Sequence, residues 1–269
     1  MPEEATRQLG LGILQRVAMR EMARLQSHFL SELNRLPLGE QLVFRGGAAL
    51  HGVYLGGRWS KDLDFFAPPE IAFGIRAIAA EQGLLLEEPP KVIEEGYTLR
   101  GHKRDPTARP DGTLSVFALP GTVHSRVEIR VDVCSRDNTL FPVERQMFVP
   151  LSYPPVSVRV QRLSELMADK FGCVLRRSKA MDFLDLWYGL NARPDLKDEI
   201  RDVMERKDCG PYDIVPLQTF TTEAALAHLE NTEETWDEKT STALSTPPSF
   251  DRVREDLTVW LPFFNMTEQ

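Results

Sequence analysis

The sequence has few cysteines, and those it has are dispersed. Cys134, Cys173 and Cys209 are odd in number and lie in no Cys-x-x-Cys or Cys/His cluster. A disulfide framework and a structural zinc site are therefore not expected, and this cysteine usage is typical of a reducing compartment. We expect a cytoplasmic protein.

Long apolar runs and an excess of positive charge are also missing. No stretch approaches the ~20 apolar residues that cross a bilayer, and the polar start of the chain is unlike a signal peptide, so no membrane association is expected. The 32 Lys and Arg residues are outnumbered by 40 Asp and Glu residues, which gives a net charge of −8. This balance excludes a broadly basic nucleic-acid coat but leaves room for a local basic patch.

Hydrophobic periodicity divides the 269 residues into two parts. An α/β domain is predicted for residues 1–155 and a helical domain for residues 156–269, which is an α+β architecture with a small mixed sheet. Strands are expected at residues 42–44, 58–66, 97–100, 113–119, 127–134 and 145–149. Helices are expected at residues 11–36, 48–54, 70–82, 161–178, 179–190, 195–207, 222–230 and 249–261, with a polar loop over 231–248.

Three acidic residues fall on two of the predicted strands. Asp62 and Asp64 flank Leu63, so strand alternation directs both carboxylates to one face of the sheet. Two like charges this close favour a cation between them, and Mg²⁺ or Mn²⁺ takes such oxygen ligands. On the strand over 127–134, Asp132 lies on the polar face and joins the pair if the two strands are neighbours. The alternative is a solvent-facing strand whose acids hold no metal.

Two glycines, Gly46 and Gly47, follow the first predicted strand and precede a short helix. Backbone N–H groups in such a turn converge on an anion, and the start of a helix adds favourable partial charge. Ser60 shares a strand face with Asp62, and its hydroxyl suits a terminal phosphate, whose charge Arg58 would help to neutralise. A tight turn without a ligand and a surface arginine are the alternatives.

A lysine interrupts the apolar stripe of the helix predicted over 161–178. Lys170 must extend to solvent, pair with an acid or serve a site. On the next helix, Asp182 and Asp185 are three residues apart and share a face. Asp182 is therefore a candidate to orient Lys170 or to act as a base on an acceptor hydroxyl. A solvated acidic face is the alternative.

The strongest local basic cluster lies between these two helices, at Arg176, Arg177 and Lys179. Such residues contact RNA phosphates in nucleic-acid-binding proteins, or they decorate the end of a helix. The cluster slightly favours an RNA acceptor over a small cationic one.

Together these motifs resemble the signatures of a known family. The segment FRGGAALHGVYLGGRWSKDLDFF resembles the first signature of the AbiEii/AbiGii toxin nucleotidyltransferases, in which a Gly-Gly turn precedes an R-x-S-x-D-x-D-F strand. The segment LSELMADKFGCVLRRSKAMDFLDLWYGL is similar to the second signature, which has a lysine on one helix and a D-x-x-D pair on the next. The matched order spans about residues 42–190, and Ala48 stands where the family often has a hydroxyl residue.

The resemblance implies a polymerase-β-like nucleotidyltransferase domain whose nucleotide cleft is closed by the helical domain. It also implies Mg²⁺, an NTP donor, a cognate antitoxin and transfer of a nucleoside monophosphate, in some members to the 3′ end of tRNA. By position, phosphate binding maps to Gly46, Gly47 and Ser60, metal binding to Asp62 and Asp64, and the helical-domain catalytic pair to Lys170 and Asp182.

Two other functions stay open on the sequence alone. A small-molecule nucleotidyltransferase of the antibiotic-modifying type would share the strand acids, and the net charge of −8 suits a cationic acceptor. A non-catalytic regulatory module would bind a nucleotide without turnover. The complete set of acids, serine and lysine favours an enzyme.

Overall fold

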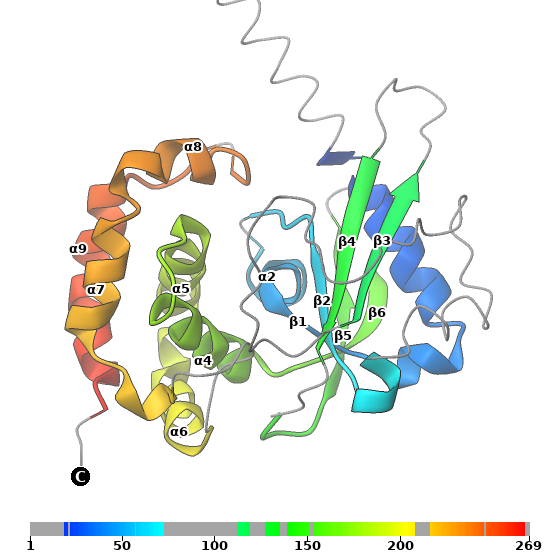
Figure 1. Ribbon diagram of the computed structural model, residues 1–269, viewed down its shortest axis with the longest axis horizontal. Coiled ribbons are helices and arrows are strands. Elements are labelled where there is room, and N and C mark those ends of the chain that lie inside the picture. Colours follow the sequence, from blue (N-terminus) through cyan, green and yellow to red (C-terminus); the bar gives the residue numbers. More distant parts are fainter. Residues whose placement is uncertain are drawn as a thin grey trace, which may run out of the picture. The chain divides into compact units, whose positions relative to one another are not determined.

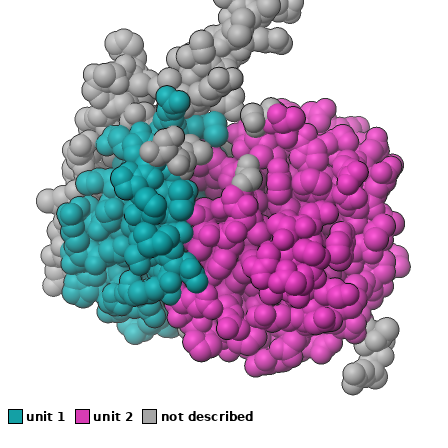
Figure 2. Space-filling view, turned by 180° about the vertical axis from the view of Figure 1, so that it is seen from behind, with its two compact units in different colours: residues 1–44, 61–135, 145–159 teal, residues 45–60, 136–144, 160–269 magenta. Residues whose placement is uncertain are grey.

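The computed structural model describes residues 19–20, 22–56, 58–72, 112–118, 127–134, 139–150, 153–207, 216–244 and 246–266. The chain divides into two compact units, coloured separately in Figure 2. Unit 1 contains residues 1–44, 61–135 and 145–159, and unit 2 contains residues 45–60, 136–144 and 160–269. The division into domains 1–155 and 156–269 stays a prediction; the units differ from it because residues 45–60 and 136–144 belong with the helical residues.

Unit 1 is built around a six-stranded mixed sheet with the strand order β3-β4-β2-β1-β6-β5 (Figure 1). β2 runs parallel to β4, and β3 runs antiparallel to β4. The strands are β1 (Val43–Arg45), β2 (Leu63–Phe66), β3 (Gly112–Ala118), β4 (Val127–Cys134), β5 (Glu144–Phe148) and β6 (Val156–Val160). A mixed sheet followed by a helical unit confirms the predicted α+β class.

Alternation of apolar and polar residues explains why β2 and β4 are strands. Leu63 and Phe65 of β2 are 0% and 2% exposed, and the residue between them is only half-buried. β4 repeats the pattern, since Ile129, Val131 and Val133 are all fully buried. One face of each strand therefore lies in the core and the other carries the polar side chains.

Four strands lie within one residue of their predicted bounds, those expected at 42–44, 113–119, 127–134 and 145–149. The strand expected over 58–66 begins only at Leu63, and its first three expected residues, 58–60, belong to unit 2. β6 was not predicted, because its V-S-V-R-V alternation is short and is followed almost directly by a helix. The strand expected at 97–100 lies outside the described residues.

A helix over residues 22–33 supplies further apolar surface to unit 1. Leu25, Phe29 and Leu33 are at most 3% exposed. After this helix, Asn34 Nδ2 donates a hydrogen bond of 2.5 Å to the Ser157 carbonyl oxygen of β6. The start of the helix expected over 11–36 lies outside the described residues, as does most of the helix expected over 70–82.

Unit 2 is helical after β6, as predicted. Its helices are α4 (Leu163–Val174), α5 (Ala180–Ala192), α6 (Lys197–Arg206), α7 (Thr222–Glu230), α8 (Trp236–Thr240) and α9 (Phe250–Trp260). The prediction of a loop over 231–248 is wrong at α8, which lies within that range. Trp236 explains the difference, because its ring is 1% exposed and its Nε1–H donates to the Pro248 carbonyl oxygen at 2.9 Å. No helix in the described part of the chain is long and apolar enough to cross a bilayer.

Helix α4 is the centre of unit 2. All of its residues are buried, and it contacts α5 and α6. The Phe171 ring lies 5.0 Å from that of Phe220 and 4.5 Å from that of Phe264, measured between centroids. Because α4 is buried all round, its charged residues need partners inside the protein.

The partner of Asp169 in α4 is Lys207, which directly follows α6. Lys207 is 1% exposed, and its Nζ donates to Asp169 Oδ1 at 2.5 Å. Arg45 Nη2 lies 3.7 Å from the other carboxylate oxygen. With its amide oriented to suit these neighbours, Gln161 donates to Asp169 at 3.3 Å and accepts from Lys207 at 3.2 Å. These contacts join α4, the end of α6 and Arg45 within unit 2.

Replacing Lys207 with methionine leaves Asp169 buried beside a weaker partner. We expect Lys207→Met to lower the free energy of unfolding by about 3–5 kcal/mol, the usual cost of removing one member of a buried ion pair. Chemical denaturation measures this. The matched control is Lys239→Met, which removes an exposed lysine paired with Glu238 and should change stability by less than about 1 kcal/mol. Equal losses in the two variants would contradict the prediction.

Candidate active site

The chain leaves β1 through the turn at Gly46 and Gly47. Gly46 has a φ of 73°, a left-handed conformation that glycine adopts without steric cost. α2 (Gly46–Ala49) begins in this turn and continues as a π-helical turn, η2 (Leu50–Leu55). π-Helical turns are rare and are frequently found at functional sites. The short helix expected over 48–54 is therefore present, although more than half of it has π geometry.

Gly47 lies against two of the predicted phosphate-binding side chains. A Cβ atom on Gly47 would be 2.6 Å from Arg58 Nη2 and 3.5 Å from Ser60 Oγ. All of these residues belong to unit 2. The structure thus brings backbone amides, a guanidinium and a hydroxyl together, and each of these groups donates hydrogen bonds to phosphate oxygens.

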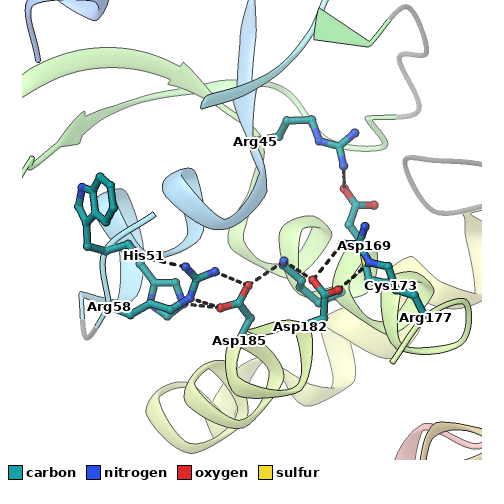
Figure 3. Close-up of polar contacts among 10 residues, drawn as sticks. Arg45, His51, Arg58, Asp169, Cys173, Arg177, Asp182 and Asp185 are labelled. Atoms are coloured by element: carbon teal, nitrogen blue, oxygen red, sulfur yellow. Dashed lines mark hydrogen bonds and ion pairs between the residues drawn. The ribbon is translucent and has the colours of Figure 1, made fainter. Parts of the chain in front are cut away.

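A buried carboxylate on α5 holds Arg58 in place. Asp185 is 0% exposed, and Arg58 Nε and Nη2 donate to its two oxygens at 2.5 and 2.8 Å (Figure 3). Lys170 Nζ lies 2.7 Å from Asp185 Oδ2. His51 Nε2 lies 2.9 Å from Asp185 Oδ1. Each oxygen of Asp185 therefore has two nitrogen atoms within 2.9 Å.

Lys170 is shared between Asp185 and Asp182. Its Nζ donates to Asp182 Oδ1 at 2.9 Å, and the residue is only 9% exposed. Extension to solvent, which the sequence left open for Lys170, is thereby ruled out. Arg177 also pairs with Asp182, through Nε at 2.7 Å and Nη2 at 3.2 Å. The acidic face predicted on α5 is not solvated but buried under three cations.

The opposing charges decide the ionisation of these carboxylates. Burial on its own would raise the pKa of Asp182 and of Asp185. Lys170 and Arg177 outweigh burial at Asp182 and lower its pKa, and Arg58 and Lys170 hold the pKa of Asp185 well below its usual range. Burial would lower the pKa of Lys170, but Asp182 and Asp185 outweigh it and raise that pKa. At neutral pH both acids and the lysine are charged.

The acids lie in unit 1: Asp64 is in β2, Asp132 is in β4, and Asp62 directly precedes β2. β2 and β4 are neighbours, and their register pairs Asp64 with Asp132. Arg130 donates a hydrogen bond to Asp132. This bond, with the charges of Asp132, Asp62 and Asp64, raises the pKa of the Arg130 guanidinium against the effect of burial. The three carboxylates thus act on one common cation.

The chemistry of these acids suits a divalent metal. Their hard oxygen donors suit Mg²⁺, and the predicted pairing of the two acid-bearing strands is confirmed. In the part of the chain that the structure describes, however, no three His, Cys, Asp or Glu side chains are gathered closely enough to hold a metal ion. The donor chemistry and the strand register fit a divalent metal, and the metal role of Asp62, Asp64 and Asp132 stays a prediction.

The predicted basic cluster separates into two environments. Arg177 is half-buried and faces Asp182, whereas Arg176 and Lys179 are exposed. Sequence reasoning missed His51 as a site residue and gave Asp185 no role. The available signals were a histidine in the apolar segment AALHGVYL and an acid within the apolar segment FLDLW.

The class of protein indicated by this fold and site is a nucleotidyltransferase. Comparison with protein families agrees, because the profile described as nucleotidyl transferase AbiEii toxin, type IV toxin–antitoxin system, matches residues 28–256. The chain belongs to this family of nucleotidyltransferase toxins.

The first of two similar solved structures shares the fold. MenT4, a nucleotidyltransferase toxin from Mycobacterium tuberculosis, is 18% identical, with a TM-score of 0.59, over 96% of this chain and 87% of its own. JHP933 from Helicobacter pylori is 14% identical, with a TM-score of 0.49, over 91% of each chain. A comparison with curated proteins finds no match.

A methyl group at Gly47 tests the packing of the turn. In Gly47→Ala the Cβ would lie 2.6 Å from Arg58 Nη2, and Arg58 has little freedom to move because Asp185 binds it through two nitrogens. We expect NTP binding to weaken about tenfold or more, the cost of losing one charge-assisted hydrogen bond. Equilibrium binding of a labelled NTP measures this. The control is Asp237→Asn, at an exposed position outside the site, which should bind the NTP as the wild type does.

The lowered pKa values predict acid sensitivity. A carboxyl whose pKa is lower in the folded state stabilises the fold above its unfolded pKa of about 4, and this contribution is lost as the pH falls through the folded value. We expect the free energy of unfolding to fall below about pH 4, and to fall less steeply in Asp182→Asn. Denaturation at a series of pH values measures the slope. Asp237→Asn, at an exposed position, should keep the wild-type slope; an unchanged slope in Asp182→Asn would contradict the prediction.

Proposed function

We propose that the protein transfers a nucleoside monophosphate from an NTP to the 3′ end of tRNA in a Mg²⁺-dependent reaction, and that this activity makes it a toxin. One observation carries the proposal: Asp185 fixes both Arg58 and Lys170, and Arg58 lies beside the Gly47 backbone and Ser60. Preorganised donors of this kind stabilise the charge that develops on a transferring phosphoryl group.

The triphosphate binds at the glycine turn. Arg58 and Lys170 are cations whose side chains are 6% and 11% exposed, so their charges act in a region of low dielectric where ionic interactions are strong. Gly47 has no side chain to keep a phosphate away from the backbone, and Ser60 adds a hydroxyl donor. These residues hold the β- and γ-phosphates while the acceptor oxygen bonds to the α-phosphorus and pyrophosphate leaves.

Asp62, Asp64 and Asp132 would hold the metal ion. Its bound charge would neutralise the triphosphate and the leaving pyrophosphate. The acids are half-buried, in β2, in β4 and directly before β2, and Asp64 and Asp132 are register partners. Arg130 lies within the electrostatic influence of the same three acids.

Asp182 acts by position rather than as a base. It is 3% exposed, and its lowered pKa makes the carboxylate a weak proton acceptor. Its two oxygens hold Lys170 and Arg177. Of the two roles that the sequence allowed for Asp182, orienting Lys170 is the one that its contacts support.

Two partners follow from the family and the surface charge. A type IV toxin–antitoxin system implies a cognate antitoxin. Arg176 and Lys179 are exposed next to Arg177 and Asp182 in the sequence, and exposed basic residues of this kind bind the phosphates of a nucleic acid. They support tRNA as the acceptor.

The direct test is transfer of label from NTP to RNA. Purified protein is incubated with Mg²⁺, total tRNA and each α-³²P-labelled NTP in turn. We expect label to enter tRNA with one preferred NTP, and we expect EDTA and Asp62→Ala each to abolish transfer. Loss of an essential charged group at a phosphoryl-transfer site typically lowers the rate by ~10³-fold or more.

The control variant is Asp237→Asn, at an exposed position outside the site, which should transfer label at the wild-type rate. Label on the protein or on a small molecule, with none on RNA, would contradict the tRNA acceptor. Failure of every NTP to bind in the presence of metal would contradict the enzymatic proposal as a whole.

A further inference from the structure

His51 is buried in unit 2 and faces two hydrogen-bond acceptors. Its side chain is 1% exposed. Nδ1 lies 2.5 Å from the Gly56 carbonyl oxygen and Nε2 lies 2.9 Å from Asp185 Oδ1. The ring of Tyr188 meets the imidazole edge-on at 5.7 Å between centroids. A carbonyl oxygen and an ionised carboxylate can only accept hydrogen bonds.

This geometry defines the protonation state of the ring. A neutral imidazole has one N–H and one bare nitrogen, and the bare nitrogen would point its lone pair at an oxygen lone pair in either tautomer. Only the imidazolium ion donates from both nitrogens. A buried acceptor or donor without a partner is costly, so both contacts are satisfied together only when His51 carries a proton on each nitrogen.

The π-helical turn creates this arrangement. The Gly56 N–H donates to the His51 carbonyl oxygen at 2.8 Å, while the Gly56 carbonyl faces the His51 ring. Gly56 has a φ of 64°, which is the conformation that glycine favours. The backbone at the end of η2 is therefore bent so that its carbonyl oxygen is available to the imidazole.

Asp185 links His51 to the phosphate-binding cations. Its Oδ1 is in contact with His51 Nε2 and Arg58 Nε. Its Oδ2 is in contact with Arg58 Nη2 and Lys170 Nζ. A carboxylate has about four lone-pair sites, and four nitrogen atoms approach this one. Without His51, the nitrogen atoms at Asp185 are those of Arg58 and Lys170, the two cations that the carboxylate itself positions, so His51 is the contact that holds the carboxylate independently of them.

We propose that His51 is a positioning residue, present as the imidazolium ion, which fixes the Asp185 carboxylate and thereby aligns Arg58 and Lys170 for the triphosphate. The proposal rests on the proposed function for its kinetic consequence but not for the charge state of the ring. With His51 charged, four cations (His51, Arg58, Lys170 and Arg177) face two carboxylates (Asp182 and Asp185). A triphosphate is a polyanion, and its binding would neutralise this excess of buried positive charge.

The charge state is measured on the wild-type protein by NMR. With ¹⁵N-labelled histidine, long-range proton–nitrogen correlation distinguishes imidazolium from either neutral tautomer, and loss of one signal in His51→Gln assigns it among the five histidines. We expect both ring nitrogens of His51 to be protonated at neutral pH. A bare ring nitrogen would overturn the proposal, and this measurement stands even if no nucleotidyl transfer is found.

Two substitutions separate positioning from a general structural role. In His51→Gln the amide nitrogen takes the place of Nε2 and keeps the hydrogen bond to Asp185. In His51→Asn it takes the place of Nδ1 and keeps only the bond to Gly56. We expect kcat/KM for the NTP to be about tenfold lower in His51→Asn than in His51→Gln, a factor that corresponds to one hydrogen bond to a charged group, with the loss divided between KM and kcat.

The matched control is His28→Gln, at an exposed position on the helix of residues 22–33, which should keep wild-type kinetics. Equal kinetics in His51→Asn and His51→Gln would overturn the positioning role. Circular dichroism and thermal unfolding of both variants identify any loss that comes from misfolding. If wild-type protein transfers no label at all, the proposed function fails while the NMR result still decides the state of His51.

Discussion

The structure of unit 2 depends on one buried carboxylate, that of Asp185. Removing a carboxylate from water costs several kcal/mol, and a single cation at 4 Å returns about 4 kcal/mol at the effective dielectric constant near a protein surface. Arg58 and Lys170 together therefore outweigh burial, which agrees in direction with the lowered pKa of Asp185. The same contacts tie the segment after β1 to α4 and α5. The same contacts therefore stabilise the fold of unit 2 and fix the positions of the cations.

Charge balance around this carboxylate explains why the site suits a triphosphate. Asp182 and Asp185 hold Lys170, Arg177 and Arg58 by direct contacts. Acids placed between the cations suppress their mutual repulsion and leave a positive surplus. An open cluster of cations would bind phosphate more tightly in the ground state but would have no fixed geometry. Fixed geometry favours the transition state, so the acids serve catalysis by limiting how the cations move.

Sequence patterns predicted the elements better than the contacts between them. Strand alternation located β4 to the residue, because it depends on a local period of two. The pairing of Lys170 with Asp182 followed from adjacent helices. Contacts of Asp185 with Arg58 and His51 cross 127 and 134 residues, and no local period encodes them. The sequence showed only that a histidine and an acid interrupt apolar segments.

Three glycines show how the local chain creates this long-range site. Gly46 and Gly56 have positive φ angles of 73° and 64°, and they bound the helical segment that contains His51. Gly47 has an ordinary conformation, but Arg58 Nη2 occupies the space in which a Cβ would lie. Gly46 and Gly56 thus set the path of the backbone, and Gly47 sets how closely a guanidinium approaches it. This glycine-rich segment has the pattern of a simple turn. It nevertheless determines how the Gly56 carbonyl is oriented toward His51 and how closely Arg58, which Asp185 holds, packs against the backbone.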